Sequence, residues 1–117
     1  MTNLCHFSLT YDSTDEIIRV LAKNCSHCLQ ILDIEYSTLV TDESINDFLA
    51  CKRLVKLHMF HTGLSLPGKA RLLLNLKNLR ILVRGDFLCD VLDYIDDNLE
   101  VDKVGKLKLE EFWLEPR

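Results

Sequence analysis

Short groups of apolar residues recur along the chain at a nearly constant interval. Each group consists of an apolar residue, two free positions, a second apolar residue, one free position and a third apolar residue. The leucines that open the groups are evenly spaced over Leu4, Leu29, Leu54 and Leu79, and the last interval, to Leu109, is slightly longer. Fourteen of the fifteen pattern positions hold Leu, Ile, Met or Phe, and the exception is Arg84. Such a regular interval indicates an internal repeat.

Each group predicts a β-strand, because two of its apolar residues lie two positions apart and therefore point to the same side. A segment with helical spacing follows each strand. Ser13 and Glu16 stand in capping-box arrangement ahead of the first helix, and Thr41 or Asp42 can cap the second. Pro67 suits the first position of the third helix. The predicted inward residues of the four helices are Ile17, Val20 and Leu21; Ile45, Phe48 and Leu49; Ala70, Leu73 and Leu74; and Val91, Leu92, Ile95 and Leu99.

A strand and a helix within so short a repeat can bury their apolar faces only against the next copy. We therefore predict one α/β domain over residues 1–117, built as a solenoid of about 4.5 repeats. In this right-handed β-α superhelix, a parallel sheet lines the concave side and the helices form the convex side. The longer interval before Leu109 is expected to reflect a loop within Asp96–Lys106, around Gly105.

The groups resemble leucine-rich repeats, and the segment 39–54 resembles the cysteine-containing subclass found in F-box proteins. The matching residues are Thr41, Asp42, Leu49, Ala50, Cys51 and Leu54. Ser37 stands where that family has Cys or Asn, and Arg84 and Phe87 depart from its pattern. The resemblance implies an RNI-like array that selects a substrate for a ubiquitin ligase, while a separate F-box recruits the ligase core. We see no F-box in this sequence.

Aromatic and acidic residues gather at the free strand positions and just beyond them, on the side that the predicted sheet turns to solvent. Rigid rings are common at the centres of protein interfaces. We therefore predict a protein-binding surface on the concave face, although Trp113 could instead cap an exposed end of the sheet. The predicted surface consists of Asp33, Glu35, Tyr36, His58, Phe60, His61 and Trp113.

The charge and the cysteine content restrict the class of partner and the compartment. Eighteen acidic residues against 14 Lys and Arg give a net charge of −4, which argues against binding to nucleic acid. No apolar run is long enough for a bilayer, and no signal-peptide pattern is visible. Five cysteines without such a signal are typical of a reducing compartment. We expect an intracellular protein, cytoplasmic or nuclear.

The sequence favours neither catalysis nor a cofactor. It contains no G-x-S-x-G, P-loop or H-E-x-x-H motif. Cys25 and Cys28, with His58 and His61, have spacings that would suit zinc only if all four converged. The repeat places the two pairs about a strand length apart, so we predict no metal and no cofactor.

The function predicted from these features is non-enzymatic protein recognition, by resemblance the substrate-binding repeats of an F-box-type ubiquitin ligase receptor. The alternative is a structural or regulatory scaffold without a ligase role. Solenoids need polar caps at their terminal repeats, and no dedicated cap is visible here. Such a scaffold would self-associate through its uncapped ends.

Overall fold

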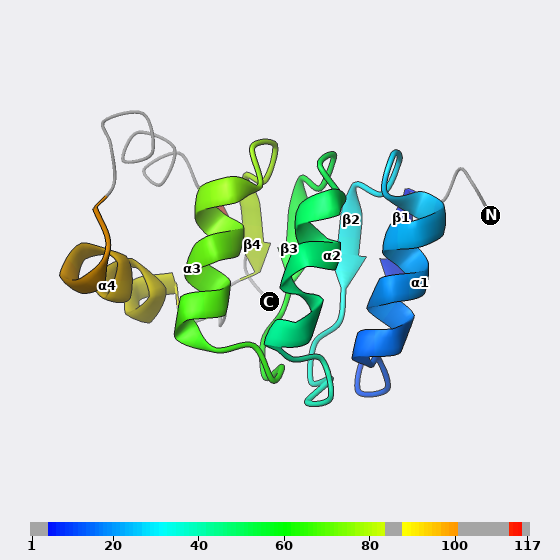
Figure 1. Ribbon diagram of the computed structural model, residues 1–117, viewed down its shortest axis with the longest axis horizontal. Helices are drawn as coiled ribbons and strands as arrows, with labels where there is room; N and C mark the ends of the chain where they lie inside the picture. The colour runs from blue at the N-terminus through cyan, green and yellow to red at the C-terminus, as the bar shows by residue number, and fades with distance from the viewer. Residues whose placement is uncertain (1–4, 84–87, 101–112, 116–117) are drawn as a thin grey trace.

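Strands and helices alternate along the chain in the computed structural model, which describes residues 5–83, 88–100 and 113–115 (Figure 1). The strands are β1 (His6–Ser8), β2 (Ile31–Asp33), β3 (Lys56–His58), β4 (Ile81–Val83) and β5 (Trp113–Glu115). The helices are α1 (Asp15–Cys25), the 3-10 turn η1 (Asp42–Ser44), α2 (Ile45–Ala50), α3 (Leu66–Asn75) and α4 (Leu88–Asn98). Leu4, Arg84, Phe87, Leu109 and the predicted loop around Gly105 lie outside the described residues.

The strands form one parallel sheet in the order β1-β2-β3-β4-β5. The centres of the first three strands are in register at the repeat interval, with Phe7 opposite Leu32 and Leu32 opposite Leu57. The last pair differs, because Leu82 lies opposite Leu114, whereas the apolar groups align Leu82 with Phe112. A shift of two positions leaves every strand residue on the same side of the sheet, so the apolar pattern could not distinguish the two registers.

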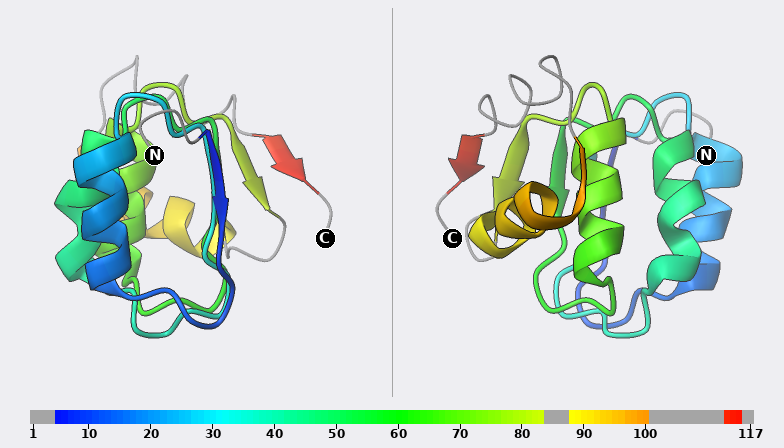
Figure 2. Two further views of the ribbon diagram at one scale, coloured as in Figure 1. Left: turned by 90° about the vertical axis from the view of Figure 1, so that its right-hand side faces the viewer. Right: turned by 60° about the vertical axis from the view of Figure 1, so that its left-hand side comes forward.

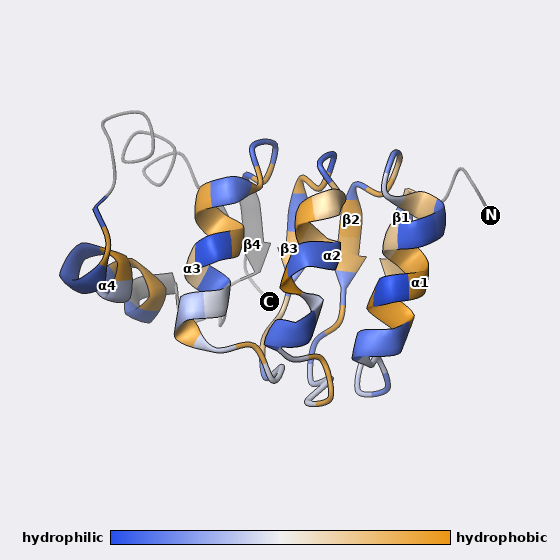
Figure 3. Cartoon of the chain, in the orientation of Figure 1, coloured by the Kyte–Doolittle hydropathy of each residue, from blue (hydrophilic) through white to orange (hydrophobic). Residues whose placement is uncertain are grey.

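The helices cover one face of the sheet only (Figure 2). Leu32 and Leu57, at the centres of β2 and β3, are at most 1% exposed, because they point toward the helices. The flanking strand residues alternate to the opposite face, which none of the described helices covers. Hydropathy follows this layering, with polar residues on the outward side of α1, α2 and α3 (Figure 3).

The prediction of a solenoid of about 4.5 repeats is wrong. The Cα atoms have a radius of gyration of 13.3 Å and extents of 38 × 27 × 25 Å. A compact domain of this length is expected to have a radius of gyration of about 13 Å. Only the first three strand–helix units are stacked regularly, and α4 lies across the end of that stack (Figure 1). The fold is therefore a small compact α/β domain, too short to extend into a superhelix.

The inward face of α1 is displaced by one residue from the prediction. Ile18, Leu21 and Cys25 are buried, whereas Val20 is 53% exposed. The helix begins one residue later than the capping-box motif predicts, because the Thr14 hydroxyl accepts the Ile17 N–H. Positions 17, 20 and 21 and positions 18, 21 and 22 both have helical spacing, and only the packing against the sheet separates them.

The second and third helical segments begin close to the predicted signals. The Thr41 hydroxyl caps η1, as predicted, whereas Pro67 is the second residue of α3, one position later than predicted, because the helix begins at Leu66 after the Ser65 cap. Phe48 in α2 and Leu73 in α3 are completely buried. Leu99, beyond the end of α4, is 39% exposed, although the apolar pattern predicts that it faces inward.

A carboxylate at the start of each of the first two helical segments holds the next unit. Asp15, in α1, accepts hydrogen bonds from the Thr41 backbone N–H at 2.8 Å, from the Thr41 hydroxyl at 2.7 Å and from the Ser44 hydroxyl. One unit later, Asp42 accepts the Ser65 N–H at 2.9 Å and the Ser65 hydroxyl. Burial raises the pKa of Asp15, but the hydrogen bonds from Ser44 and Thr41 outweigh it and hold that pKa below its ordinary value. These contacts fix the spacing of the loops that follow the strands.

Leu57→Ala should lower the free energy of unfolding by about 2–5 kcal/mol, because it opens a cavity at the centre of the sheet. Leu57 is completely buried. The matched control is Leu39→Ala, which removes the same atoms from a side chain that is 67% exposed and should change stability by less than about 0.5 kcal/mol. Urea denaturation of both variants measures the difference, and equal losses would contradict the assigned core.

Asp15→Asn should destabilise the chain by about 1 kcal/mol at neutral pH, since it removes a charged acceptor of three hydrogen bonds at a partly exposed site. A pKa that is lowered on folding contributes stability above the ordinary value of 3.8, and this contribution is lost as the pH falls through the folded-state pKa. The difference between wild type and variant should therefore shrink below about pH 4. Urea midpoints at pH 7 and pH 3 measure it, with the exposed Asp93→Asn as control.

Candidate functional site

The candidate surface lies at the carboxyl ends of β2 and β3, on the sheet face that the helices leave uncovered (Figure 2). Asp33 is the last residue of β2, and His58 is its neighbour in β3. The turns that follow these strands carry Glu35 and Tyr36, and Phe60 and His61. The in-register pairing brings equivalent turn residues together, although they are one full repeat apart in the sequence.

Four rings form what we call the ring ladder: Tyr11, Tyr36, Phe60 and His61. Tyr11 stacks on Tyr36 with ring centroids 5.0 Å apart and planes inclined by 9°. Tyr36 stacks on His61 at 5.4 Å and meets the edge of Phe60 at 5.6 Å. Phe60 and His61 lie 4.1 Å apart, and Tyr11 is 67% exposed. The ladder therefore presents ring surface from three successive turns.

The three stacked members of the ladder share a backbone conformation that bulky residues rarely adopt. Tyr11, Tyr36 and His61 have φ values of +70°, +61° and +54°. This left-handed region favours glycine, and such a residue costs on the order of 1 kcal/mol or more. Hydrogen bonds across the turns hold it, since the Tyr11 N–H donates to the Glu35 carbonyl at 2.9 Å and the Tyr36 N–H to the Phe60 carbonyl at 2.8 Å.

Beside the ladder lies what we call the acid–histidine cluster: Asp33, Glu35 and His58. The Nδ1 atom of His58 is 3.5 Å from Oδ2 of Asp33 and 3.7 Å from Oε1 of Glu35. The three side chains are only 20%, 12% and 18% exposed, in that order. Asp33 is held in turn by the Glu35 backbone N–H, which donates to its Oδ1 at 3.2 Å.

The structure brings together the predicted surface residues except Trp113, whose side chain lies outside what the structure describes. The backbone of Trp113, in β5, pairs with that of Ile81, in β4. Tyr11 is not among the predicted surface residues, although it precedes Tyr36 by one repeat interval and stacks on it. The repeat interval was the signal for it, because Tyr11, Tyr36 and His61 occupy one column of the repeat.

The cysteine pair does not join the histidines. In the described part of the chain, the group of three or more side chains whose donor atoms could meet at a metal is Asp33, Glu35 and His58. No disulfide joins the four cysteines whose side chains the structure describes, which are Cys5, Cys25, Cys28 and Cys51. Burial, more than the neighbouring Cys25 thiol, raises the pKa of Cys28, and burial raises the pKa of Cys51 to about 11. The Cys28 thiol is protonated near neutral pH, which does not suit the attacking thiol of a redox pair.

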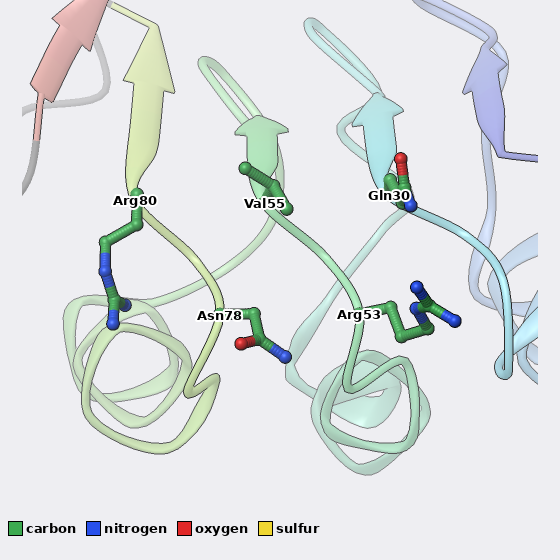
Figure 4. Close-up of a pocket in the computed structure, with 5 residues that line it drawn as sticks. All are labelled: Gln30, Arg53, Val55, Asn78 and Arg80. Carbon is green, nitrogen blue, oxygen red and sulfur yellow. The ribbon is translucent and has the colours of Figure 1, made fainter.

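A basic hollow of about 310 Å³ opens at the other ends of the strands (Figure 4). It is lined by Gln30, Arg53, Val55, Asn78 and Arg80. One nitrogen of Arg80 donates to the carbonyls of Lys77 at 2.7 Å and Leu79 at 2.8 Å, and the Asn78 amide donates to the Lys52 carbonyl at 2.8 Å. These side chains satisfy carbonyls in the segments that follow α2 and α3, where positive charge complements the helix dipole. Their arrangement is explained without a ligand.

Cys51 should resist alkylation at pH 8, because a thiol with a pKa of about 11 forms little thiolate there. The exposed Cys5 is the internal reference, and it should react fully under conditions in which Cys51 stays unmodified. Iodoacetamide labelling of the native chain, followed by peptide mass spectrometry, measures both rates. Equal labelling would mean that Cys51 is not buried as described, and labelling in urea should abolish the difference.

None of the helices that the structure describes has the length and the apolar content needed to cross a membrane. Comparison of the chain with protein-family models, with curated proteins and with solved structures found no significant match. The function therefore has to be argued from the ring ladder and the acid–histidine cluster themselves.

Proposed function

We propose that the chain is a non-enzymatic recognition module that binds a segment of a partner protein bearing arginine or lysine. The ring ladder would be its contact surface, and Asp33 and Glu35 would supply the charge that selects the partner. The observation that carries the proposal is the stacking of Tyr11, Tyr36 and His61 in one row along the turns that follow β1, β2 and β3.

The ladder has the properties of an interface rather than of a core. Tyr11 is 67% exposed although its ring is large, and Tyr36 and Phe60 are only partly buried. Aromatic rings contribute contact area at a small cost in side-chain entropy, which explains their frequency at interface centres. The backbone also adopts an unfavourable conformation at three of these residues, which a purely structural turn could avoid with glycine.

The charge beside the rings favours a cationic partner. Two carboxylates, Asp33 and Glu35, lie next to the ladder, and Glu35 is joined to it by the hydrogen bond from the Tyr11 N–H. Arginine can stack on an aromatic face and at the same time pair with a carboxylate. A guanidinium stacked on the exposed ring of Tyr11, at the end of the ladder, would use both features.

The segment that resembles the repeats of F-box proteins supports a narrower version of the proposal. If that resemblance reflects function, the bound segment belongs to a protein that is selected for ubiquitination. A self-associating scaffold is the competing proposal, and sedimentation distinguishes it, because a scaffold would form larger species as concentration rises whereas a receptor would stay monomeric.

The double variant Tyr36→Asn/Phe60→Ala should lose at least tenfold in affinity for arginine-bearing peptides and keep its fold. Asparagine tolerates the left-handed conformation at position 36. Peptides are first selected from a random library on the wild-type chain, and fluorescence anisotropy then measures their binding to each variant. Substitution of the peptide arginine by glutamate should abolish binding.

The matched control is Val20→Ala, which truncates an exposed side chain on the helical side of the domain and should leave peptide binding unchanged. Circular dichroism checks the fold of each variant. Selection of peptides without basic residues, or equal binding by wild type and the double variant, would refute the proposal.

A further inference from the structure

We infer that Asp33, Glu35 and His58 form a binding site for one divalent cation of the zinc class. Two carboxylate oxygens and one imidazole nitrogen converge there from β2, the turn after it and β3. This inference rests on the geometry of the acid–histidine cluster and is independent of the recognition role of the ring ladder.

The distances within the cluster fit a shared ion better than a direct pair. His58 Nδ1 lies 3.5 Å from Asp33 Oδ2 and 3.7 Å from Glu35 Oε1. A hydrogen bond between an imidazolium and a carboxylate would be about 2.7–2.9 Å long. Zinc–ligand bonds of about 2.1 Å in a tetrahedron place the ligand atoms about 3.4 Å apart. Donor atoms from all three residues lie within 4.8 Å of one another, so small side-chain rotations complete the arrangement.

The cluster is held in place before any ion arrives. Glu35 is buried, and its backbone carbonyl is fixed by the Tyr11 N–H. The Asp33 carboxylate accepts the Glu35 N–H at 3.2 Å, and the Ser8 hydroxyl reaches its other oxygen at 3.5 Å. A hydrogen bond to the carboxylate of a metal ligand orients it and so contributes to affinity. Side chains that are already ordered lose little entropy when they bind.

The donor set selects the kind of ion. Two carboxylates and a neutral imidazole carry a charge of about −2, which a divalent cation neutralises. Imidazole with carboxylate oxygens suits zinc and its first-row neighbours, whereas calcium requires six or more oxygen ligands. Three protein ligands leave a fourth position for water, as in zinc sites that stay open to a further ligand.

The test is calorimetric titration of the full chain with zinc chloride, together with cobalt substitution. We expect one zinc ion per chain, with at least a tenfold loss of affinity in His58→Ala, Asp33→Asn and Glu35→Gln. His6→Asn is the matched control, because His6 is an exposed residue of β1 that belongs neither to the donor group nor to the ring ladder, and it should keep the wild-type affinity. Calcium and magnesium should not displace zinc at tenfold excess.

Thiols also bind zinc, so a second control separates the two sources. The variant Cys25→Ser/Cys28→Ser should bind zinc with unchanged affinity, and the cobalt form of the wild type should lack the intense thiolate-to-cobalt absorption. The cobalt spectrum needs no variant, so it keeps the inference testable if a cluster variant fails to fold. No zinc binding at micromolar concentration, zinc affinity that is lost with the cysteines, or binding that survives His58→Ala would each overturn the inference.

A metal ion in the cluster would neutralise the carboxylates that attract a cationic peptide, so Asp33 and Glu35 belong to both proposals and do not distinguish them. His58 belongs to the metal site alone, whereas Tyr36 and Phe60 belong to the ring ladder alone. Zinc affinity should not change in Tyr36→Asn/Phe60→Ala, which alters the ring ladder alone. Failure of zinc binding would leave peptide binding by the ladder untouched, and failure of peptide selection would leave the zinc titration unaffected.

Discussion

The parallel pairing of β1, β2 and β3 at one constant repeat interval determines where almost every other side chain lies. Hydrogen bonding continues in the same register beyond the strands, through the N–H groups of Tyr11 and Tyr36. Equivalent residues of successive units therefore lie side by side, at the spacing of neighbouring strands. The buried leucines form one row toward the helices, and the rings form another at the carboxyl edge of the sheet. The acid–histidine cluster is a product of the same alignment, since it joins β2 to β3.

The repeat and its aromatic columns could be predicted from the sequence, because both depend on side chains that recur at a fixed interval. The strands with Leu32 and Leu57 at their centres, the capping by Thr41 and the gathering of Tyr36 with Phe60 and His61 all followed from that interval. The exposure of Val20 could not be predicted from that interval, because two helical faces one residue apart have almost the same apolar spacing. Long-range packing decides between them.

The apolar repeat pattern could not predict the dimensions of the fold or the acid–histidine cluster, for two further reasons. A repeat interval describes how one unit follows another, but not how many units keep that relation, and α4 already departs from it (Figure 1). The meeting of Asp33, Glu35 and His58 depends on side-chain rotamers in adjacent turns. The sequence shows these residues only as neighbours in the predicted sheet. A site built from side-chain directions requires the three-dimensional structure.

The left-handed backbone at Tyr11, Tyr36 and His61 has a consequence for how this sequence can vary. Glycine at any of these positions would relax the turn but remove a ring from the row, and a β-branched residue would fit neither requirement. At these three positions, a substitution that increases stability therefore removes part of the aromatic surface, and a ring that keeps the surface also keeps the unfavourable backbone conformation. In descendants of this chain that lose the need for the surface, these are the positions at which glycine or asparagine should accumulate first.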